Sequence, residues 1–140
     1  MLHITTPETT VLLTGDFDTR DSSLVHGAQP VKTDILFVEG TYGGRDHPPK
    51  QEEIDRFISS VEAVVRRGGT VLIPAFANGR TQDVVMMLHQ YLPRLNVHVD
   101  GMGKRVAKTH MNHPNLLRDS TALERAWRWA KQVSSKSDRK

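Results

Sequence analysis

Two short apolar runs near the start of the chain each lead into a carboxylate. Val11–Thr14 is followed by Gly15 and Asp16, and Asp34–Val38 is followed at once by Glu39. Short apolar runs that stop at a glycine or a charged residue are typical of buried β-strands. Because sites in α/β proteins gather at the carboxyl ends of strands, the pattern predicts that the two carboxylates share one sheet edge.

Farther along, the hydrophobic spacing changes to that of helices. In residues 50–67 the apolar positions recur every three or four residues, which predicts a helix with one buried face. Acidic residues in its first turn, basic residues in its last turn and the following Gly68 support these bounds. The same reasoning predicts a short strand or arm over residues 1–10, strands at 70–74 and 96–100, and helices at about 81–91, 104–110 and 121–133.

The alternation of helices with short apolar strands indicates an α/β fold with a largely parallel sheet flanked by helices. The chain has no cysteine, so a metal would need histidine, aspartate or glutamate ligands. No apolar run is long enough to span a membrane, and no signal peptide is evident. We therefore expect a cytoplasmic protein with no membrane partner.

The basic character of the chain is concentrated near its end. The net charge is +3, and residues 118–140 hold seven Lys or Arg against three Asp or Glu. Such a patch favours nucleic acid through the release of counterions from phosphates. The alternative is a solvated helix face followed by a polar tail.

Asp16 and Glu39 are the strongest candidates for chemistry. Two carboxylates at one edge can bind a cation or set up proton transfer. The alternative is that both are ordinary loop carboxylates that cap backbone N–H groups. The seven histidines form neither an H-x-H nor an H-E-x-x-H motif, so no zinc site can be assigned to them.

The loop before the second predicted helix offers a different kind of site. Residues 77–82, ANGRTQ, combine a glycine turn, a helix start and the cation of Arg80. Free N–H groups and an arginine at one place suit a phosphate. A plain strand-to-helix turn explains the same residues, and taken alone they favour that explanation.

Several motifs, taken together, resemble one known family. TGDFDTRDS, VEGTYGG, GGTVLIPAFANGRTQD and VHVDGMGKR occur in the order and at the distances found in the β-CASP branch of the metallo-β-lactamase superfamily. That branch includes RNase J and the cleavage-and-polyadenylation endonuclease, and its archaeal members look most similar. The resemblance implies that residues 1–43 form the last strands of a metallo-β-lactamase αββα core and that residues 44–140 form most of a β-CASP cap.

The resemblance also implies an activity and roles for particular residues. Members of the family are zinc-dependent ribonucleases that hold single-stranded RNA beneath the cap. The motif match makes Asp16 the ligand that bridges two zinc ions and Glu39 the group that orients a catalytic histidine. It makes Arg80, Lys104 and Arg105 candidates for contact with RNA.

The match departs from the family pattern in the zinc ligands. The H-x-H-x-D-H segment that precedes the TGD motif in the family is absent, and so are two later histidine motifs. We therefore expect a fragment or truncated relative that is inactive as an isolated chain. The alternative is a non-catalytic RNA-binding or interaction module. Strands that lack their sheet neighbours would favour a homodimer or a complementing chain.

Overall fold

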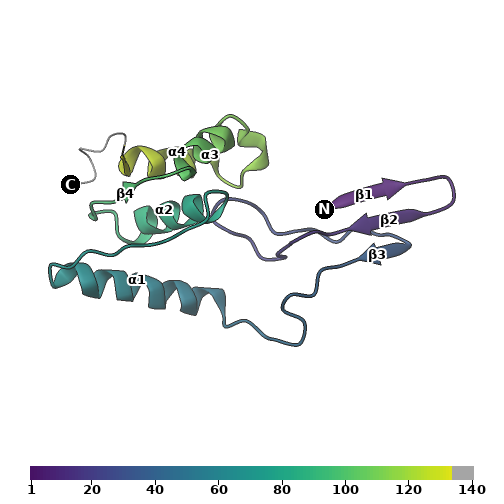
Figure 1. The fold of residues 1–140 in the computed structure, drawn as a ribbon, viewed down its shortest axis with the longest axis horizontal. Coiled ribbons are helices and arrows are strands. Elements are labelled where there is room, and N and C mark those ends of the chain that lie inside the picture. Colours follow the sequence, from purple (N-terminus) through teal and green to yellow (C-terminus); the bar gives the residue numbers. More distant parts are fainter. Residues whose placement is uncertain (134–140) are drawn as a thin grey trace. The chain divides into compact units, whose positions relative to one another are not determined.

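The computed structural model describes residues 1–133, which form two compact units (Figure 1). The first unit comprises residues 1–22 and 26–47, and the second comprises residues 23–25 and the chain from Pro48 onward. The boundary predicted between residues 43 and 44 lies a few residues before Pro48. The assignment of the two parts to a hydrolase core and a β-CASP cap stays a prediction.

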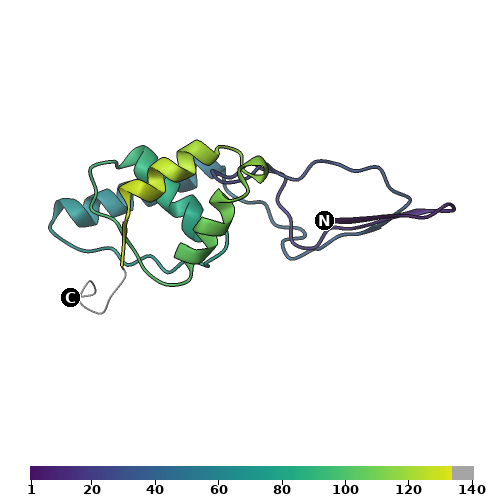
Figure 2. The same ribbon diagram turned by 90° about the horizontal axis from the view of Figure 1, so that it is seen from above.

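The first unit is built on a three-stranded sheet, seen nearly edge-on in Figure 2. Strand β1 (Leu2–Thr5) pairs antiparallel with β2 (Thr10–Leu13), and β2 pairs parallel with β3 (Ile35–Phe37). Asp34 fixes the start of the parallel pair, because its carboxylate accepts hydrogen bonds from the Thr10 N–H at 2.8 Å and the Thr10 hydroxyl at 2.7 Å. The predicted strands near residues 11–14 and 34–38 are thus confirmed.

This sheet leaves much of its apolar surface in contact with solvent. Every residue of β1 and β3 is exposed, and Leu12 on β2 is the buried apolar side chain among the described strand residues of this unit. The expectation of helices on both faces is not met within this unit.

The second unit is mainly helical. Its helices are α1 (Lys50–Arg66), α2 (Arg80–Tyr91), α3 (Gly103–Met111) and α4 (Ser120–Trp129), with a 3₁₀ turn η1 (Pro114–Leu116). Its core gathers side chains from α2, α3 and α4 around the fully buried Leu123. Leu24 joins this core and is held at both backbone groups: its N–H donates to the Asp83 carboxylate at 3.0 Å, and its carbonyl accepts from the Arg118 N–H at 2.9 Å. No helix in residues 1–133 is both long enough and apolar enough to cross a bilayer.

A two-stranded parallel sheet replaces the end of the last predicted helix. Strands β4 (His98–Val99) and β5 (Lys131–Gln132) pair in parallel. The prediction of helix as far as Val133 is wrong, because α4 ends at Trp129 and Ala130 is extended. Ala130 and Val133 fit a helical stripe in sequence, but both are buried here through strand geometry.

The prediction of a strand at 70–74 is also wrong, because these residues pair with no other strand in the described part of the chain. These residues belong to no helix and to no sheet in the described part of the chain. The fold is therefore mixed α/β, as expected, but residues 1–133 contain two small sheets instead of one largely parallel sheet.

Candidate functional site

The two carboxylates singled out in the sequence follow adjacent parallel strands. Leu13, the last residue of β2, is in register with Phe37, the last residue of β3. Asp16 and Glu39 come three and two residues after those strand ends. The structure thus places both residues beyond the same edge of one sheet.

Thr14 ties the two segments together at this edge. It is only 5% exposed, its N–H donates to the Phe37 carbonyl at 3.0 Å, and its hydroxyl accepts from the Glu39 N–H at 3.3 Å. Gly15, with φ of 56°, then turns the chain toward Asp16. The sequence reasoning missed Thr14; its signal was a polar residue that ends an apolar run before a glycine.

The two carboxylates differ in their surroundings. Glu39 is half-buried and accepts a hydrogen bond from the Thr41 N–H at 2.8 Å. That hydrogen bond, with a further one from the Thr41 side chain, lowers the pKa of Glu39 below its ordinary value. Asp16 is exposed and makes no hydrogen bond or ion pair with residues 1–133. Glu39 thus caps its own loop, while the Asp16 carboxylate faces solvent.

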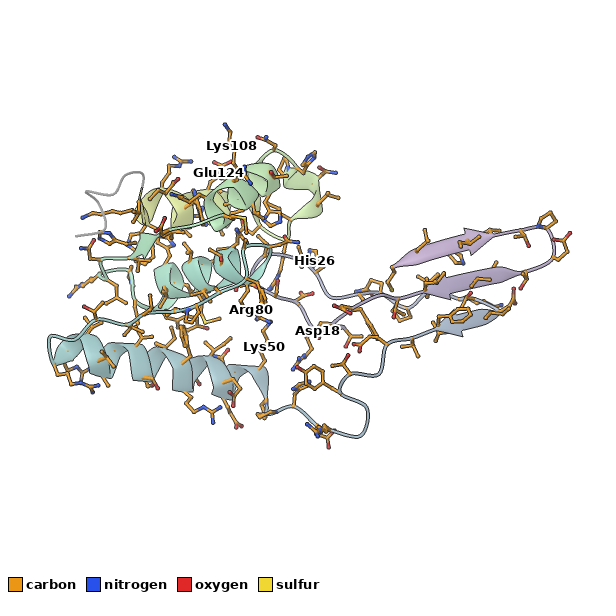
Figure 3. The ribbon with its side chains drawn as sticks, in the orientation of Figure 1. Asp18, His26, Lys50, Arg80, Lys108 and Glu124 are labelled. Atoms are coloured by element: carbon orange, nitrogen blue, oxygen red, sulfur yellow. The ribbon has the colours of Figure 1, made fainter. Side chains whose placement is uncertain are left out.

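Other acidic residues of the first unit are engaged in holding the loop after β2. The Asp18 carboxylate binds the Arg20 guanidinium through two contacts of 3.0 Å. The Asp21 carboxylate accepts from the Gly27 N–H at 2.8 Å and lies 3.5 Å from Nδ1 of His26. Figure 3 labels Asp18 and His26 in this loop. The acidic side chains of Asp18 and Asp21 therefore have a structural role in this loop.

Gly27 is needed for the same loop to close. A Cβ atom at this position would lie 2.1 Å from the Thr19 carbonyl oxygen, which no side-chain movement could relieve. The Ala28 N–H then donates to the Asp18 carbonyl at 2.8 Å. The loop that carries Asp16 is thereby folded back on itself.

The donor set at this edge does not fit a two-zinc centre. Zinc in proteins is held by three or four side-chain ligands. Within the described residues, no group of three or more His, Asp or Glu side chains is placed to hold a metal ion. Asp16 and Glu39 supply two carboxylates, and one of them already caps a backbone N–H.

The basic candidates lie at the starts of two helices in the second unit. Arg80 is the first residue of α2 and follows Gly79, whose φ is 78° (Figure 3). Arg105 lies in the first turn of α3. Both side chains are exposed and form no ion pair with residues 1–133.

Gln82, which the sequence reasoning did not single out, holds these two helix starts together. Its side chain is fully buried, and its amide nitrogen donates to the carbonyls of Ala77 at 3.1 Å and Gly103 at 3.0 Å. Gly103 packs so closely on Thr81 that a Cβ there would lie 2.8 Å from the Thr81 methyl carbon. The positive ends of α2 and α3 are therefore neighbours.

Lys104 is in a different position from its neighbour Arg105. Its ammonium donates to the Val133 carbonyl and lies 3.7 Å from the Asp100 carboxylate. The side chain is only 26% exposed. Lys104 thus fastens the end of β5 to α3, and an RNA contact from it would require these bonds to break.

The two tryptophans of α4 make structural contacts. Trp127 is buried in the core. The Trp129 indole N–H donates to the Pro93 carbonyl at 2.9 Å, and its ring centroid lies 5.3 Å from that of His89. Trp129 therefore packs the end of α4 against the end of α2.

Charge is divided unequally between the two units. The first unit has three Lys or Arg and seven Asp or Glu, a balance of −4. Residues 48–133 of the second unit have thirteen Lys or Arg and eight Asp or Glu, a balance of +5. An anionic ligand such as a phosphate chain is therefore favoured by the second unit.

Comparison with known proteins finds relatives among RNA-processing enzymes. The chain is 36% identical over 134 residues to the probable RNase MJ4 of Methanocaldococcus jannaschii, with 93% of this chain and 31% of that protein covered. It is 36% identical over 118 residues to cleavage and polyadenylation specificity factor subunit 3 of Dictyostelium discoideum, with 78% and 15% covered. It is 33% identical over 114 residues to ribonuclease TTHA0252 of Thermus thermophilus, with 78% and 26% covered.

These matches agree with the resemblance carried by the four sequence motifs. No protein-family model matches the chain. The chain spans less than a third of the length of these relatives, so the activity of the whole proteins does not transfer to it directly. By its sequence, the chain is related to the β-CASP ribonucleases of the metallo-β-lactamase superfamily.

Proposed function

We propose that this chain is a portion of a zinc-dependent β-CASP ribonuclease that cannot hydrolyse RNA alone. This portion includes the end of the sheet that carries Asp16 and Glu39. In the complete site, Asp16 would bind metal and Glu39 would orient a histidine. The portion also carries Arg80 and Arg105 for contact with the RNA backbone. Hydrolysis would require the remaining ligands from another segment or a complementing chain.

One observation supports this proposal above the others. Asp16 and Glu39 follow adjacent strands in parallel register, yet no third donor joins them in the described residues. A site with two carboxylates cannot satisfy the coordination that zinc requires. These two observations support the proposal that the chain carries part of a metal site without its full ligand set.

The test is a cleavage assay on the purified chain. We expect the unmodified chain, incubated with Zn²⁺ and labelled single-stranded RNA, to release no more product than the Asp16→Ala variant does. We also expect native mass spectrometry to find no stoichiometric zinc. Cleavage that a chelator abolishes would contradict the proposal, provided that the Asp16→Ala variant has lost it and the Asp46→Ala variant has retained it. Asp46 is the matched control because it too is an exposed carboxylate in the first unit.

A second candidate function is RNA binding without catalysis. The adjacent starts of α2 and α3, each with an exposed arginine, and the balance of +5 in residues 48–133 favour it. Backbone N–H groups at helix starts and arginine side chains are both suited to phosphate. Binding of single-stranded RNA that is followed by no cleavage even when the missing zinc ligands are supplied by the remainder of a related ribonuclease would support this function over the first.

A further inference from the structure

Residues 23–25 belong to the second unit, although the chain on both sides of them belongs to the first. The buried residue of this segment is Leu24, which is 3% exposed and is part of the core around Leu123. Phe17, a larger apolar side chain in the same loop after β2, is 37% exposed. The loop therefore contributes one particular side chain, that of Leu24, to the core of the helical unit.

The backbone of Leu24 is held by the second unit as well. Its N–H donates to the Asp83 carboxylate at 3.0 Å, and its carbonyl accepts from the Arg118 N–H at 2.9 Å. Buried backbone groups need such partners, and both partners belong to the second unit. Leu24 is thus attached at three points, and it can leave the core only when all three contacts are lost.

The base of the same loop is closed within the first unit. The Gly27 N–H donates to the Asp21 carboxylate at 2.8 Å, and the Ala28 N–H donates to the Asp18 carbonyl at 2.8 Å. Asp16 lies two residues before Asp18, so the closed base limits the positions open to the chain that leads away from Asp16. Because a loop closed at its base moves as one piece, an attachment at its tip restrains the base too.

We propose that residues 23–25 are an anchor by which the second unit holds the loop that carries Asp16. Leu24 is then a positioning residue for Asp16, and the sheet of the first unit does not hold this loop by itself. Asp83, which accepts from the Leu24 N–H, lies in the first turn of α2, the helix that begins with Arg80. The helix that carries a candidate RNA contact therefore also holds the loop that carries the candidate metal ligand.

A urea series followed by NMR tests which unit holds the loop. The measurement involves neither metal nor RNA, so the anchor can fail while the proposed function stands; only its importance for a metal site rests on that function. The Gly27 and Ala28 amide resonances report the loop, the Thr10 amide resonance reports the sheet, and tryptophan fluorescence reports the second unit.

We expect the loop resonances to change together with the tryptophan fluorescence. Leu123→Ala, which weakens the core of the second unit, should move both midpoints to lower urea by the same amount and leave the Thr10 midpoint in place. Loop resonances that keep the Thr10 midpoint would overturn the proposal, because the sheet would then hold the loop.

Substitution of Leu24 itself gives a second test. Leu24→Ala should speed the exchange of the Gly27 and Ala28 amides with solvent by at least about tenfold, because truncation of a buried leucine weakens its attachment. The Thr10 amide should keep its rate. Leu24→Met, which nearly conserves volume, should restore most of the protection. Val25→Ala is the matched control, since Val25 is 42% exposed and its truncation should leave all these rates unchanged.

Three outcomes of the exchange experiment count against the anchor. Unchanged Gly27 and Ala28 rates in Leu24→Ala would show that the loop is held without it. Equal acceleration at Thr10 would show a general loss of the first unit instead of the release of one loop. An effect of Val25→Ala as large as that of Leu24→Ala would show that burial of Leu24 is not the cause. If tryptophan fluorescence shows that Leu24→Ala unfolds the second unit, Leu24→Met and the urea series decide.

Discussion

Arg80, Lys104 and Arg105 are alike in charge but differ in what surrounds that charge. The Lys104 ammonium is held by the Val133 carbonyl and lies near Asp100, whereas the two arginines project from the helix starts that Gln82 joins. A cation already bound to the protein must give up those bonds before it can bind a phosphate. At the scale of single residues, Arg80 and Arg105 are therefore the better candidates for an RNA contact.

This difference leads to a prediction for RNA binding. Arg80→Ala and Arg105→Ala should each weaken binding of single-stranded RNA, because each removes a cation that can neutralise a phosphate. Each should also reduce the slope of log affinity against log salt by about 0.7, the value expected for one phosphate on a single strand. Fluorescence anisotropy with a labelled oligonucleotide over a salt series measures both effects.

The control for this prediction is another arginine of the same unit. Arg128 is ion-paired with Glu124 at 3.0 Å on the surface of α4, and Arg128→Ala should leave the slope nearly unchanged. Equal effects of Arg128→Ala and Arg80→Ala on affinity would show that net charge alone governs binding.

Helix α4 illustrates how a single element supports the second unit. Leu123, Ala126 and Trp127 line its buried face. The Asp119 side chain caps its first turn by accepting from the Ala122 N–H at 2.8 Å. The core around α4 also includes side chains of α2 and α3. Helix α4 therefore helps to position the starts of those two helices, which carry Arg80 and Arg105.

Truncation of the core residue on this helix should be costly. Leu123 is 0% exposed, and Leu123→Ala should lower the free energy of unfolding by about 2–5 kcal/mol, because it reduces apolar burial and leaves a cavity. Leu116→Ala, at a leucine that is 68% exposed, should change it by less than about 0.5 kcal/mol. Urea unfolding followed by tryptophan fluorescence compares the two; a similar destabilisation in both would contradict the core assignment.

Elements whose pattern is local could be predicted from the sequence, and elements that depend on distant partners could not. The bounds of α1 and the strand ends before Asp16 and Glu39 were predictable because spacing and turn residues specify them, although Val61 is the one residue of the predicted apolar face of α1 that is buried. Residues 70–74 carry a strand pattern, but no neighbouring strand pairs with them in the described chain. Residues 130–133 fit a helix, yet hydrogen bonds to Val97 and Val99 make them extended.

The candidate site shows the same division. The shared edge of the two carboxylates followed from strand order. The roles of Thr14 and Gln82 did not, because each depends on a contact with a residue far away in the sequence. The hydrogen bond from Lys104 to the Val133 carbonyl could likewise not be predicted, since Val133 lies at the far end of the described chain.

At the scale of the whole molecule, the two units should respond differently to acid. In the first unit, hydrogen bonds from Thr10 lower the pKa of Asp34, and those from Thr41 lower the pKa of Glu39. In the second unit, burial lowers the pKa of His110, whose Nδ1 is buried without a partner in the described residues. In all three cases the unfolded chain binds the proton more readily than the folded one, so stability falls as pH falls.

The pH ranges of these changes are set by the ordinary pKa values of the groups. The second unit should begin to lose stability below the ordinary histidine value of 6.5, and the first below the ordinary carboxylate values of 4.5 and 3.8. Both tryptophans lie in the second unit, so their fluorescence reports the earlier change, and the Thr10 amide resonance reports the later one. His110→Gln should remove the pH dependence of the tryptophan fluorescence near pH 6 and leave that of the Thr10 amide resonance intact. Asp34→Asn should alter only the pH dependence of the Thr10 amide resonance. One transition that both variants shift equally would show that the two units unfold as a single body.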